Sequence, residues 1–352
     1  MDVAGAKSVI PTTTRAVVFH STDDLRLEQV PLPMLSAGEL LVRIRACGLC
    51  PGETMGWYMA RKAPVVLGHE PVGEVIQVGA GPTTFAPGDR VFIHHHAPCM
   101  RCRACQRGDH VHCPTWRRTR LIPGGVAEYA VVPDAIARTD TLRLPADVTD
   151  EAATFVEPLA CVVKSLQRAG LKAGDRLLVI GLGVMGLLHI LLARRLGAEV
   201  VLGADRVASR LARGKAVGAD AVIDVAREVT LDAVRGHTDG LGADVVIVGP
   251  GSVEAIDLGF QAVAPGGTLV LFTPVPEETR WPFPVHEAYF KEVRVVPSYS
   301  AGPPQTREAV RWLQDGLPVE LLVTHRYSLD EAITGYRLVC QATEALKVVI
   351  TP

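Results

Sequence analysis

Three potential metal ligands lie close together in the sequence. Cys50, His69 and Glu70 fall within the segment CGLCPGETMGWYMARKAPVVLGHE. A thiolate, an imidazole and a carboxylate supply the S, N and O donors that suit Zn²⁺. Cysteine and histidine are also ordinary core residues, so the alternative is that these side chains only pack in the core and bind no metal. The rest of the chain has to decide between the two.

Four further cysteines follow in a tight cluster with the spacing C-x2-C-x2-C-x7-C. They are Cys99, Cys102, Cys105 and Cys113. Four thiolates close a tetrahedral site with no open position, which predicts a structural Zn²⁺ that stabilises a loop with little core of its own. The alternative is surface thiols or two disulfides. A long chain that begins without the pattern of a secretory signal favours the metal.

A fourth candidate ligand for the first group lies on an expected helix. The segment 150–170 has apolar residues at helical spacing, and Glu157 stands among them, just before Pro158. A carboxylate in an apolar stretch is costly unless it is paired or bound to a metal.

A glycine-rich turn marks a candidate nucleotide site. The apolar run 177–180 is followed by G-x-G-x-x-G and then by an expected helix. The candidate cofactor-binding positions are Gly181, Gly183, Val184, Met185 and Gly186. Glycines here allow a tight turn and the close approach of a pyrophosphate to the helix N-terminus. The alternative is a doubly wound domain whose glycine turn binds nothing.

An acidic residue ends the next expected strand at the distance typical of this fingerprint. Asp205 can accept hydrogen bonds from ribose hydroxyls, which favours NAD as the cofactor over NADP. Arg206 follows it directly and could receive a 2′-phosphate, so NADP stays open as the less favoured choice.

The chain falls into two kinds of structure that would position these groups. Short β-type runs at 16–19, 25–30 and 40–45, and more up to residue 133, predict a β-barrel unit after a loose tail over 1–14. Strand–helix alternation after residue 170 predicts an α/β domain with a parallel sheet of about six strands. Helices at 303–316 and 329–340 and a strand at 345–351 are expected to return to the first unit.

Composition excludes several partners. The chain has 352 residues, enough for two domains, and a formal net charge of −2 gives no basic excess for nucleic acid. No apolar run reaches the length of a membrane span, and the start resembles neither a secretory nor a transit peptide. The expected location is the cytoplasm.

Taken together, the GHE and EP motifs, the cysteine cluster and the glycine fingerprint resemble the zinc-containing medium-chain dehydrogenases/reductases, and within them the sorbitol, threonine and polyol dehydrogenases. The resemblance implies a GroES-like catalytic domain over 1–161 and 298–352, with a Cys₄ zinc lobe at 94–116. It also implies a Rossmann coenzyme domain over 162–297. A homodimer or homotetramer is the implied assembly.

The resemblance also assigns roles to residues. It implies two zinc ions, one in the cysteine cluster and one catalytic ion held by Cys50, His69 and either Glu70 or Glu157. By the same resemblance, Arg210 flanks Asp205 and Lys347 approaches the pyrophosphate; the alternative for both is a solvated surface charge. Cys47 is expected to be a core thiol.

The implied reaction is an alcohol oxidation or its reverse. Zinc as a Lewis acid lowers the pKa of the substrate hydroxyl, and hydride passes to the nicotinamide. The usual proton-relay positions of the family are empty here, because Gly52 and Met55 have no group that carries a proton. Glu53 is expected to support the zinc ligands from behind.

Three consecutive histidines could replace the missing relay. We hypothesise that His95 or His96 faces the cleft and binds the substrate or accepts its proton, and each could equally be a histidine satisfied in the core. Further candidates for the substrate pocket are Trp57, Trp116 and Tyr299, although large aromatics more often belong to a core.

The first functional hypothesis is therefore a zinc-dependent oxidoreductase that acts on a secondary alcohol or polyol, or its ketone, with NAD(H). One alternative is a biosynthetic carbonyl reductase or a redox-neutral member with an altered proton relay. The other is a zinc- and NAD-binding protein without turnover. Retention of Cys50, His69, Glu70 and Glu157 argues against the last, since a purely structural role needs only the cysteine cluster.

Overall fold

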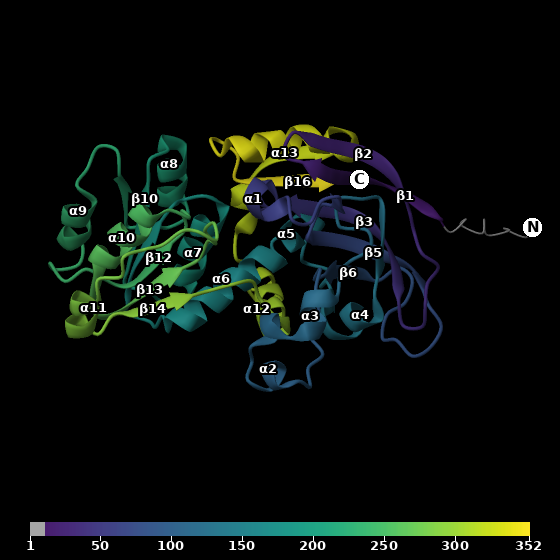
Figure 1. Cartoon of the computed structure of the whole chain (residues 1–352), viewed down its shortest axis with the longest axis horizontal. Coiled ribbons are helices and arrows are strands. Elements are labelled where there is room, and N and C mark those ends of the chain that lie inside the picture. The colour runs from purple at the N-terminus through teal and green to yellow at the C-terminus, as the bar shows by residue number, and fades with distance from the viewer. Residues whose placement is uncertain (1–10) are drawn as a thin grey trace, which may run out of the picture.

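Three β-sheets and their flanking helices form residues 11–352, the part of the chain that the computed structural model describes. Figure 1 shows a β-rich unit and an α/β unit side by side, with helices α6 (Val156–Ala169) and α12 (Pro303–Gln314) between them. Of the tail expected over 1–14, residues 1–10 lie outside the described part. Thr13 already belongs to the first strand.

The β-rich unit contains a three-stranded and a seven-stranded sheet. The small sheet has the order β2-β1-β4, with β2 Asp24–Pro31, β1 Thr13–Ser21 and β4 Val65–Val66. The main path of the large sheet is β15 Val323–Ser328, β16 Lys347–Thr351, β3 Leu40–Leu49, β5 Glu70–Val78, β6 Arg90–Ile93 and β8 Thr141–Arg143. A further strand, β7 (Tyr129–Val132), also pairs with β3.

Strand β3 lies at the centre of this unit. Its side chains at Val42 and Ile44 are buried, whereas Arg43 and Arg45 between them are exposed, as the alternating sequence predicts. Strand β16 returns from the far end of the chain and pairs antiparallel with the end of β3, with Val349 opposite Gly48. The expected return of this segment to the first unit is therefore confirmed.

The α/β unit contains a six-stranded parallel sheet in the order β11-β10-β9-β12-β13-β14. The strands are β9 Arg176–Ile180, β10 Val200–Asp205, β11 Ala221–Asp224, β12 Ala243–Val248, β13 Val263–Leu271 and β14 Arg294–Pro297. This order is that of a Rossmann fold, which confirms the expected class. The order reverses between β9 and β12, the point at which such sheets bind ligands.

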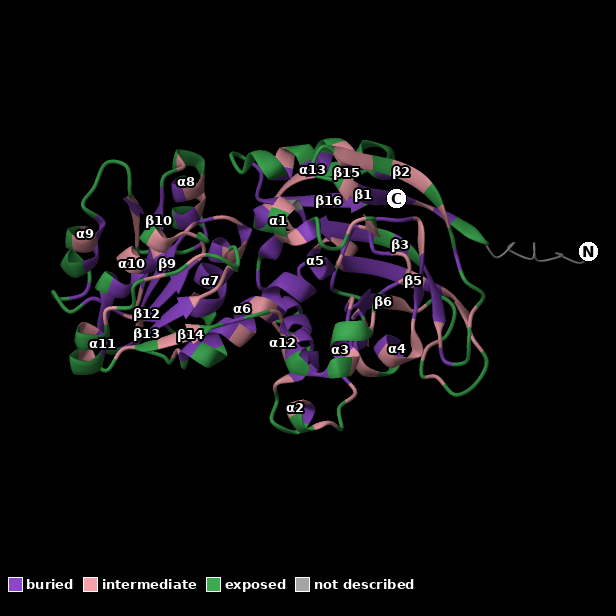
Figure 2. Cartoon of the chain, viewed as in Figure 1, coloured by how far each residue is buried: buried purple, intermediate pink, exposed green. Residues whose placement is uncertain are grey.

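The remaining helices cover the sheets and form the loops between them. The α-helices are α1 Gly56–Met59, α2 Arg103–Gln106, α3 Pro114–Arg118, α4 Asp134–Asp140, α5 Asp150–Ala153, α7 Val184–Arg195, α8 Ala208–Ala216, α9 Thr230–Gly236, α10 Val253–Ala262, α11 Val285–Lys291 and α13 Ala332–Gln341. The short 3-10 helices are η1 Pro51–Thr54, η2 His110–His112, η3 Val319–Leu322 and η4 Leu329–Glu331. Buried residues follow the strands and inner helices (Figure 2). Within the described range, none of the helices has the length and apolar content needed to span a bilayer.

The structure divides one expected helix. The segment 150–170 forms α5 and α6 with a break at Thr154 and Phe155. Pro158 then lies in the first turn of α6, where its missing N–H costs nothing, and Glu157 beside it is placed at the helix start. The break therefore fixes where the Glu157 carboxylate emerges.

A histidine is buried without charge in the α/β unit. His189 on α7 is fully buried, its Nδ1–H donates to the carbonyl of Met185 at 2.7 Å, and its Nε2 accepts from Ser165 Oγ at 2.6 Å. Burial lowers the pKa of His189 to about 4, against the smaller opposing effect of the Met185 carbonyl.

This histidine predicts a loss of stability in mild acid. Between the folded pKa and the ordinary value of 6.5, only the unfolded chain takes up the proton, so unfolding becomes easier as the pH falls. At pH 5 this amounts to about 2 kcal/mol for about 1.5 pH units. We expect His189→Leu to remove that part of the difference in unfolding free energy between pH 7 and pH 5, measured by urea denaturation. His237→Leu at an exposed position should keep it; an equal drop in both variants would contradict this origin.

Candidate functional site

Cys50, His69 and Glu70 converge in the β-rich unit. A donor atom of each lies within 4.8 Å of those of the other two. The convergence follows from strand register, because Gly48 near the end of β3 pairs with Glu70 at the start of β5. Cys50 therefore leaves β3 beside the point where His69 and Glu70 enter β5. The three donors fit a tetrahedral ion with a fourth position for another ligand.

Glu53 orients the His69 ring by a hydrogen bond at Nδ1. Its Oε1 lies 2.8 Å from His69 Nδ1 and accepts the Gly68 N–H at 2.8 Å, while its Oε2 accepts the Tyr336 hydroxyl at 2.7 Å. Burial acts to raise the pKa of Glu53, but His69, Tyr336 and Gly68 together lower it. The carboxylate thus orients the ring and leaves Nε2 for a metal, as the sequence predicted for Glu53. Tyr336 comes from the distant helix α13 and had no signal in the sequence.

Cys50 and His69 must each lose a proton before they can bind a metal ion. Burial raises the pKa of the Cys50 thiol, although His69 acts in the opposite direction. Burial tends to lower the pKa of His69, but Glu53 and Cys50 raise it well above the usual value. An ion in this position would displace protons from both, so its affinity increases with pH.

Lys347 lies beside the metal ligands. Only 1% of it is exposed, and its ammonium contacts the Glu70 carboxylate, the Thr154 carbonyl at 3.4 Å and the Phe155 ring at 4.9 Å. Lys347 is therefore not the solvated surface charge that was its alternative, because it is buried against a buried carboxylate. Its approach to the pyrophosphate stays a prediction. Burial raises the pKa of Glu70, and Lys347 opposes that shift.

Glu157 lies beside the Cys50 cluster, close enough to act electrostatically on Cys50 and Glu70. Its carboxylate clusters with donor atoms of His94 and His95, all within 4.8 Å of one another, and it is 6% exposed. It also accepts from the Cys161 thiol at 3.4 Å. Of the two carboxylates expected to complete the catalytic zinc site, Glu70 is therefore the one that the structure groups with Cys50.

The three consecutive histidines have different surroundings. His94 is fully buried, with Nδ1 2.7 Å from the Asp140 carboxylate. The ring of His95 lies 5.0 Å from that of His69 between centroids. His96 donates from Nδ1 to the Thr119 carbonyl at 2.6 Å.

Neither of the two histidines proposed as proton acceptors is basic. Burial, aided by the neighbouring histidines, lowers the pKa of His95 well below its usual value. Burial likewise lowers the pKa of His96 to about 3, and its ring packs on Trp116 with centroids 4.2 Å apart. Both rings are thus poor proton acceptors near neutral pH, because burial disfavours the imidazolium. Trp116 is a core residue, whereas Trp57 and Tyr299 are exposed.

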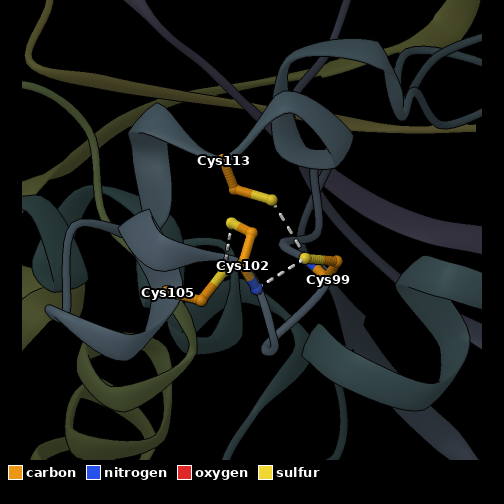
Figure 3. A group of neighbouring side chains, drawn as sticks. All are labelled: Cys99, Cys102, Cys105 and Cys113. Atoms are coloured by element: carbon orange, nitrogen blue, oxygen red, sulfur yellow. Dashed lines mark hydrogen bonds between the residues drawn. The ribbon is translucent and has the colours of Figure 1, made fainter.

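The four clustered cysteines meet in a separate lobe. Figure 3 shows their sulfurs directed toward a common centre, within 4.8 Å of one another. Backbone N–H groups of Cys99 and Cys102 donate to the sulfurs of Cys113 at 3.3 Å and of Cys99 at 3.4 Å. Burial would raise the pKa of Cys113, but such N–H donors lower it to about 6. The structure describes all eight cysteines and each is a free thiol, so the disulfide alternative is not met.

The glycine turn joins β9 to α7. Gly181 has φ +91°, a conformation that favours glycine, and a Cβ at Gly186 would lie 2.0 Å from the Gly181 carbonyl oxygen. Gly183 is the N-cap of α7, and Val184 and Met185 form its first turn. Backbone N–H groups at this helix start are available to an anion.

Asp205 closes this turn from the neighbouring strand. Its carboxylate accepts the N–H groups of Leu182 at 2.7 Å, Arg206 at 2.7 Å and Val207 at 2.9 Å. A guanidinium nitrogen of Arg210 lies 3.9 Å from it and the side chain also donates to Ala342, so Arg210 does flank Asp205. The side chain of Arg206 is exposed.

Two family models match the chain. Residues 36–145 match the alcohol dehydrogenase GroES-like domain, and residues 184–315 match the zinc-binding dehydrogenase domain. The first match covers the Cys50 cluster and the cysteine lobe, and the second begins at the start of α7.

Similar proteins of known name and structure extend over nearly the whole chain. Sorbitol dehydrogenase of Gallus gallus is 31% identical over 331 residues, 91% of this chain and 92% of the relative. Erythritol/L-threitol dehydrogenase of Mycolicibacterium smegmatis is 29% identical over 362 residues, 97% of this chain and 99% of the relative. The crystal structure of a zinc-binding dehydrogenase from Sinorhizobium meliloti bound to NADP is 29% identical with a TM-score of 0.86, covering 97% of this chain and 100% of the other.

Proposed function

Because this chain belongs to the zinc-type medium-chain dehydrogenases, we propose that it transfers hydride between a secondary alcohol or polyol, or its ketone, and NAD(H). The convergence of Cys50, His69 and Glu70, with Glu53 behind His69, is the observation that carries the proposal. Relatives that are named for sorbitol and for erythritol and threitol support the polyol class.

Seven side chains would bind the two zinc ions, and Glu53 supports one of them. Cys50, His69 and Glu70 would hold one zinc, and the four lobe cysteines would hold another. When bound, the first zinc supplies a Lewis acid for the substrate oxygen and the nicotinamide supplies the hydride acceptor. Glu53 fixes the orientation and tautomer of His69. Neither Gly52 nor Met55 has a group that carries a proton, so the alcohol proton passes to water, directly or through another hydroxyl of the substrate.

Turnover on a panel of substrates tests this function. Purified protein with NAD⁺ should oxidise at least one polyol or secondary alcohol, followed by NADH absorbance, and a chelator should remove the activity. Binding of NADH without turnover on any alcohol or ketone of the panel would instead favour a non-catalytic binding protein.

The cofactor preference rests on Asp205. A carboxylate at the end of β10 accepts ribose hydroxyls and repels a 2′-phosphate, which favours NAD over NADP. Asp205→Ser should lower the ratio of kcat/KM with NAD to that with NADP by about tenfold or more, since a tenfold change needs only about 1.4 kcal/mol. Asp224→Ser alters the register partner of Asp205 on β11 and should leave the ratio unchanged. An unaltered ratio in Asp205→Ser would show that other groups select the cofactor.

A homo-oligomer is the proposed assembly. Strand β14 is the last strand on its side of the six-stranded sheet, and Tyr289 and Phe290 on the neighbouring helix α11 are 75% and 72% exposed. An unpaired edge next to apolar side chains is suited to pairing with a second copy. Native mass spectrometry of the purified chain measures the state directly, and a monomer would refute the proposal.

A further inference from the structure

A series of neighbouring rings connects the Cys50 cluster to a cationic side chain. The ring of His69 lies 5.0 Å from that of His95, and the ring of His95 lies 4.2 Å from that of His96, between centroids. A guanidinium nitrogen of Arg120, Nη1, lies 3.1 Å from His96 Nδ1. Arg120, in the turn after α3, therefore lies two imidazole rings beyond a candidate metal ligand.

The guanidinium of Arg120 is anchored on one side and open on the other. Its Nη1 donates to the carbonyls of Arg117 at 2.8 Å and of Thr119 at 2.7 Å. Its Nε and Nη2 have no hydrogen-bond partner among the described residues, and the side chain is exposed. The N–H groups of Nε and Nη2 point the same way and match two oxygens of one carboxylate or phosphate. The open edge of Arg120 is therefore a donor pair that suits an anion.

Lys62 adds a second positive charge without an acidic partner. Within the described part of the chain it forms no ion pair, and its ammonium lies 3.8 Å from the centroid of the Tyr58 ring. The preceding residue differs, because Arg61 pairs with Glu277 at 2.7 Å. An ammonium on an aromatic face keeps its charge and has further N–H groups for an anion.

The two charges act on the same place. Burial is the main cause of the lowered pKa of His95 and of His96, and Lys62 adds to both shifts, so its charge lies near both rings. Arg120 also acts on His96. Positive charges on one side of a reaction centre attract anionic substrates and raise their local concentration. A neutral polyol would leave Lys62 and Arg120 without a counter-charge, whereas an anionic group would neutralise them.

We propose that the substrate is an alcohol with a negatively charged group, a carboxylate or a phosphate, that Arg120 and Lys62 bind beside the Cys50 cluster. The proposal rests on the dehydrogenase function proposed above and narrows its substrate class. The anionic group takes no part in the chemistry: the carbinol carbon gives its hydride to the nicotinamide, and the hydroxyl gives its proton to water. The charged group contributes binding and orientation through charge-assisted hydrogen bonds.

Two sets of substrates test the proposal on the zinc-loaded, full-length protein with NAD⁺. One set is sorbitol, gluconate and the terminal phosphate ester of sorbitol; the other is erythritol, erythronate and the phosphate ester of erythritol. In at least one set, an anionic member should exceed the neutral polyol in kcat/KM by about tenfold or more, since hydrogen bonds between charged groups are strong enough for that factor. Comparing the carboxylate with the phosphate shows which anion is preferred. Added salt should reduce the preference, because it screens exposed charges.

Replacing the two cations should remove the preference. Arg120→Gln and Lys62→Gln should each lower the ratio of kcat/KM for the anionic substrate to that for its neutral polyol by about tenfold. Arg118→Gln removes a charge at the end of α3, close to Arg120 in the sequence, and should leave the ratio unchanged. All three side chains are exposed, so the variants are expected to fold.

Two kinetic results would overturn the proposal and leave the dehydrogenase function standing. One is a neutral polyol that equals or exceeds its anionic counterparts in both sets. The other is a preference for the anion that neither Arg120→Gln nor Lys62→Gln reduces, which would mean that another group binds it.

If no compound is turned over, the dehydrogenase function fails instead, and binding decides on the anion site. Calorimetric titration with gluconate and with the phosphate ester of sorbitol measures it in the wild type and in Arg120→Gln. A Kd about tenfold weaker in the variant supports the site. Equal affinities, or no binding to the wild type, overturn it.

Discussion

Cys50→Ser is expected to lower kcat/KM by about a thousandfold or more and to remove one zinc ion per chain. A hydroxyl is a far weaker zinc ligand than a thiolate, and Cys50 is one of the three donors that cluster here among the described residues. A Lewis acid contributes several kcal/mol to stabilising the transition state, and about 4 kcal/mol corresponds to about a thousandfold. Steady-state kinetics and elemental analysis of the purified variant measure both effects.

The control is another free cysteine of the same chain. Cys340 is exposed near the end of α13, and Cys340→Ser should keep both the activity and the metal content of the wild type. If Cys50→Ser retained its zinc and its rate, the Cys50 cluster would not be the catalytic metal site.

Lys347→Met is expected to lower the unfolding free energy by about 3–5 kcal/mol. This is the range found when one partner of a buried ion pair is removed. The change leaves the buried Glu70 carboxylate without its ammonium partner. The effect should be visible in urea denaturation at neutral pH. It should also appear as a weaker metal affinity, because Glu70 is then less well oriented.

Two further variants distinguish the loss of the Lys347–Glu70 ion pair from the general effect of replacing a lysine on stability. Lys172→Met at an exposed position should change stability by less than about 0.5 kcal/mol. Adding Glu70→Gln to Lys347→Met should recover part of the loss, since it removes the unpaired charge. A double variant no more stable than Lys347→Met alone would indicate that packing, and not charge, sets the cost.

The local motifs could be read from the sequence because each is a short-range pattern. The cysteine spacing, the glycine turn with its strand and helix, and the alternation in β3 all depend on neighbouring residues. The support that Glu53 gives to His69 was expected from the family resemblance, because the two residues are 16 positions apart in the sequence. Each of these features appears in the structure as expected.

The remaining features depend on pairings between distant segments, which a single sequence does not contain. Lys347 pairs with Glu70 only because β16 is placed against β3. Glu157, at the start of α6, meets His94 and His95, which follow the distant strand β6. A resemblance supplies residue types at positions, but burial and register decide what each side chain touches.

The return of the chain to its first unit also has a consequence for biosynthesis. Tyr336 bonds to Glu53, Lys347 pairs with Glu70, and β16 pairs with the end of β3. During translation these partners emerge from the ribosome long after Cys50 and His69, at about 5–20 residues per second. A nascent chain therefore exposes unsupported metal ligands until residue 351 is free, and only then can the centre acquire its final geometry.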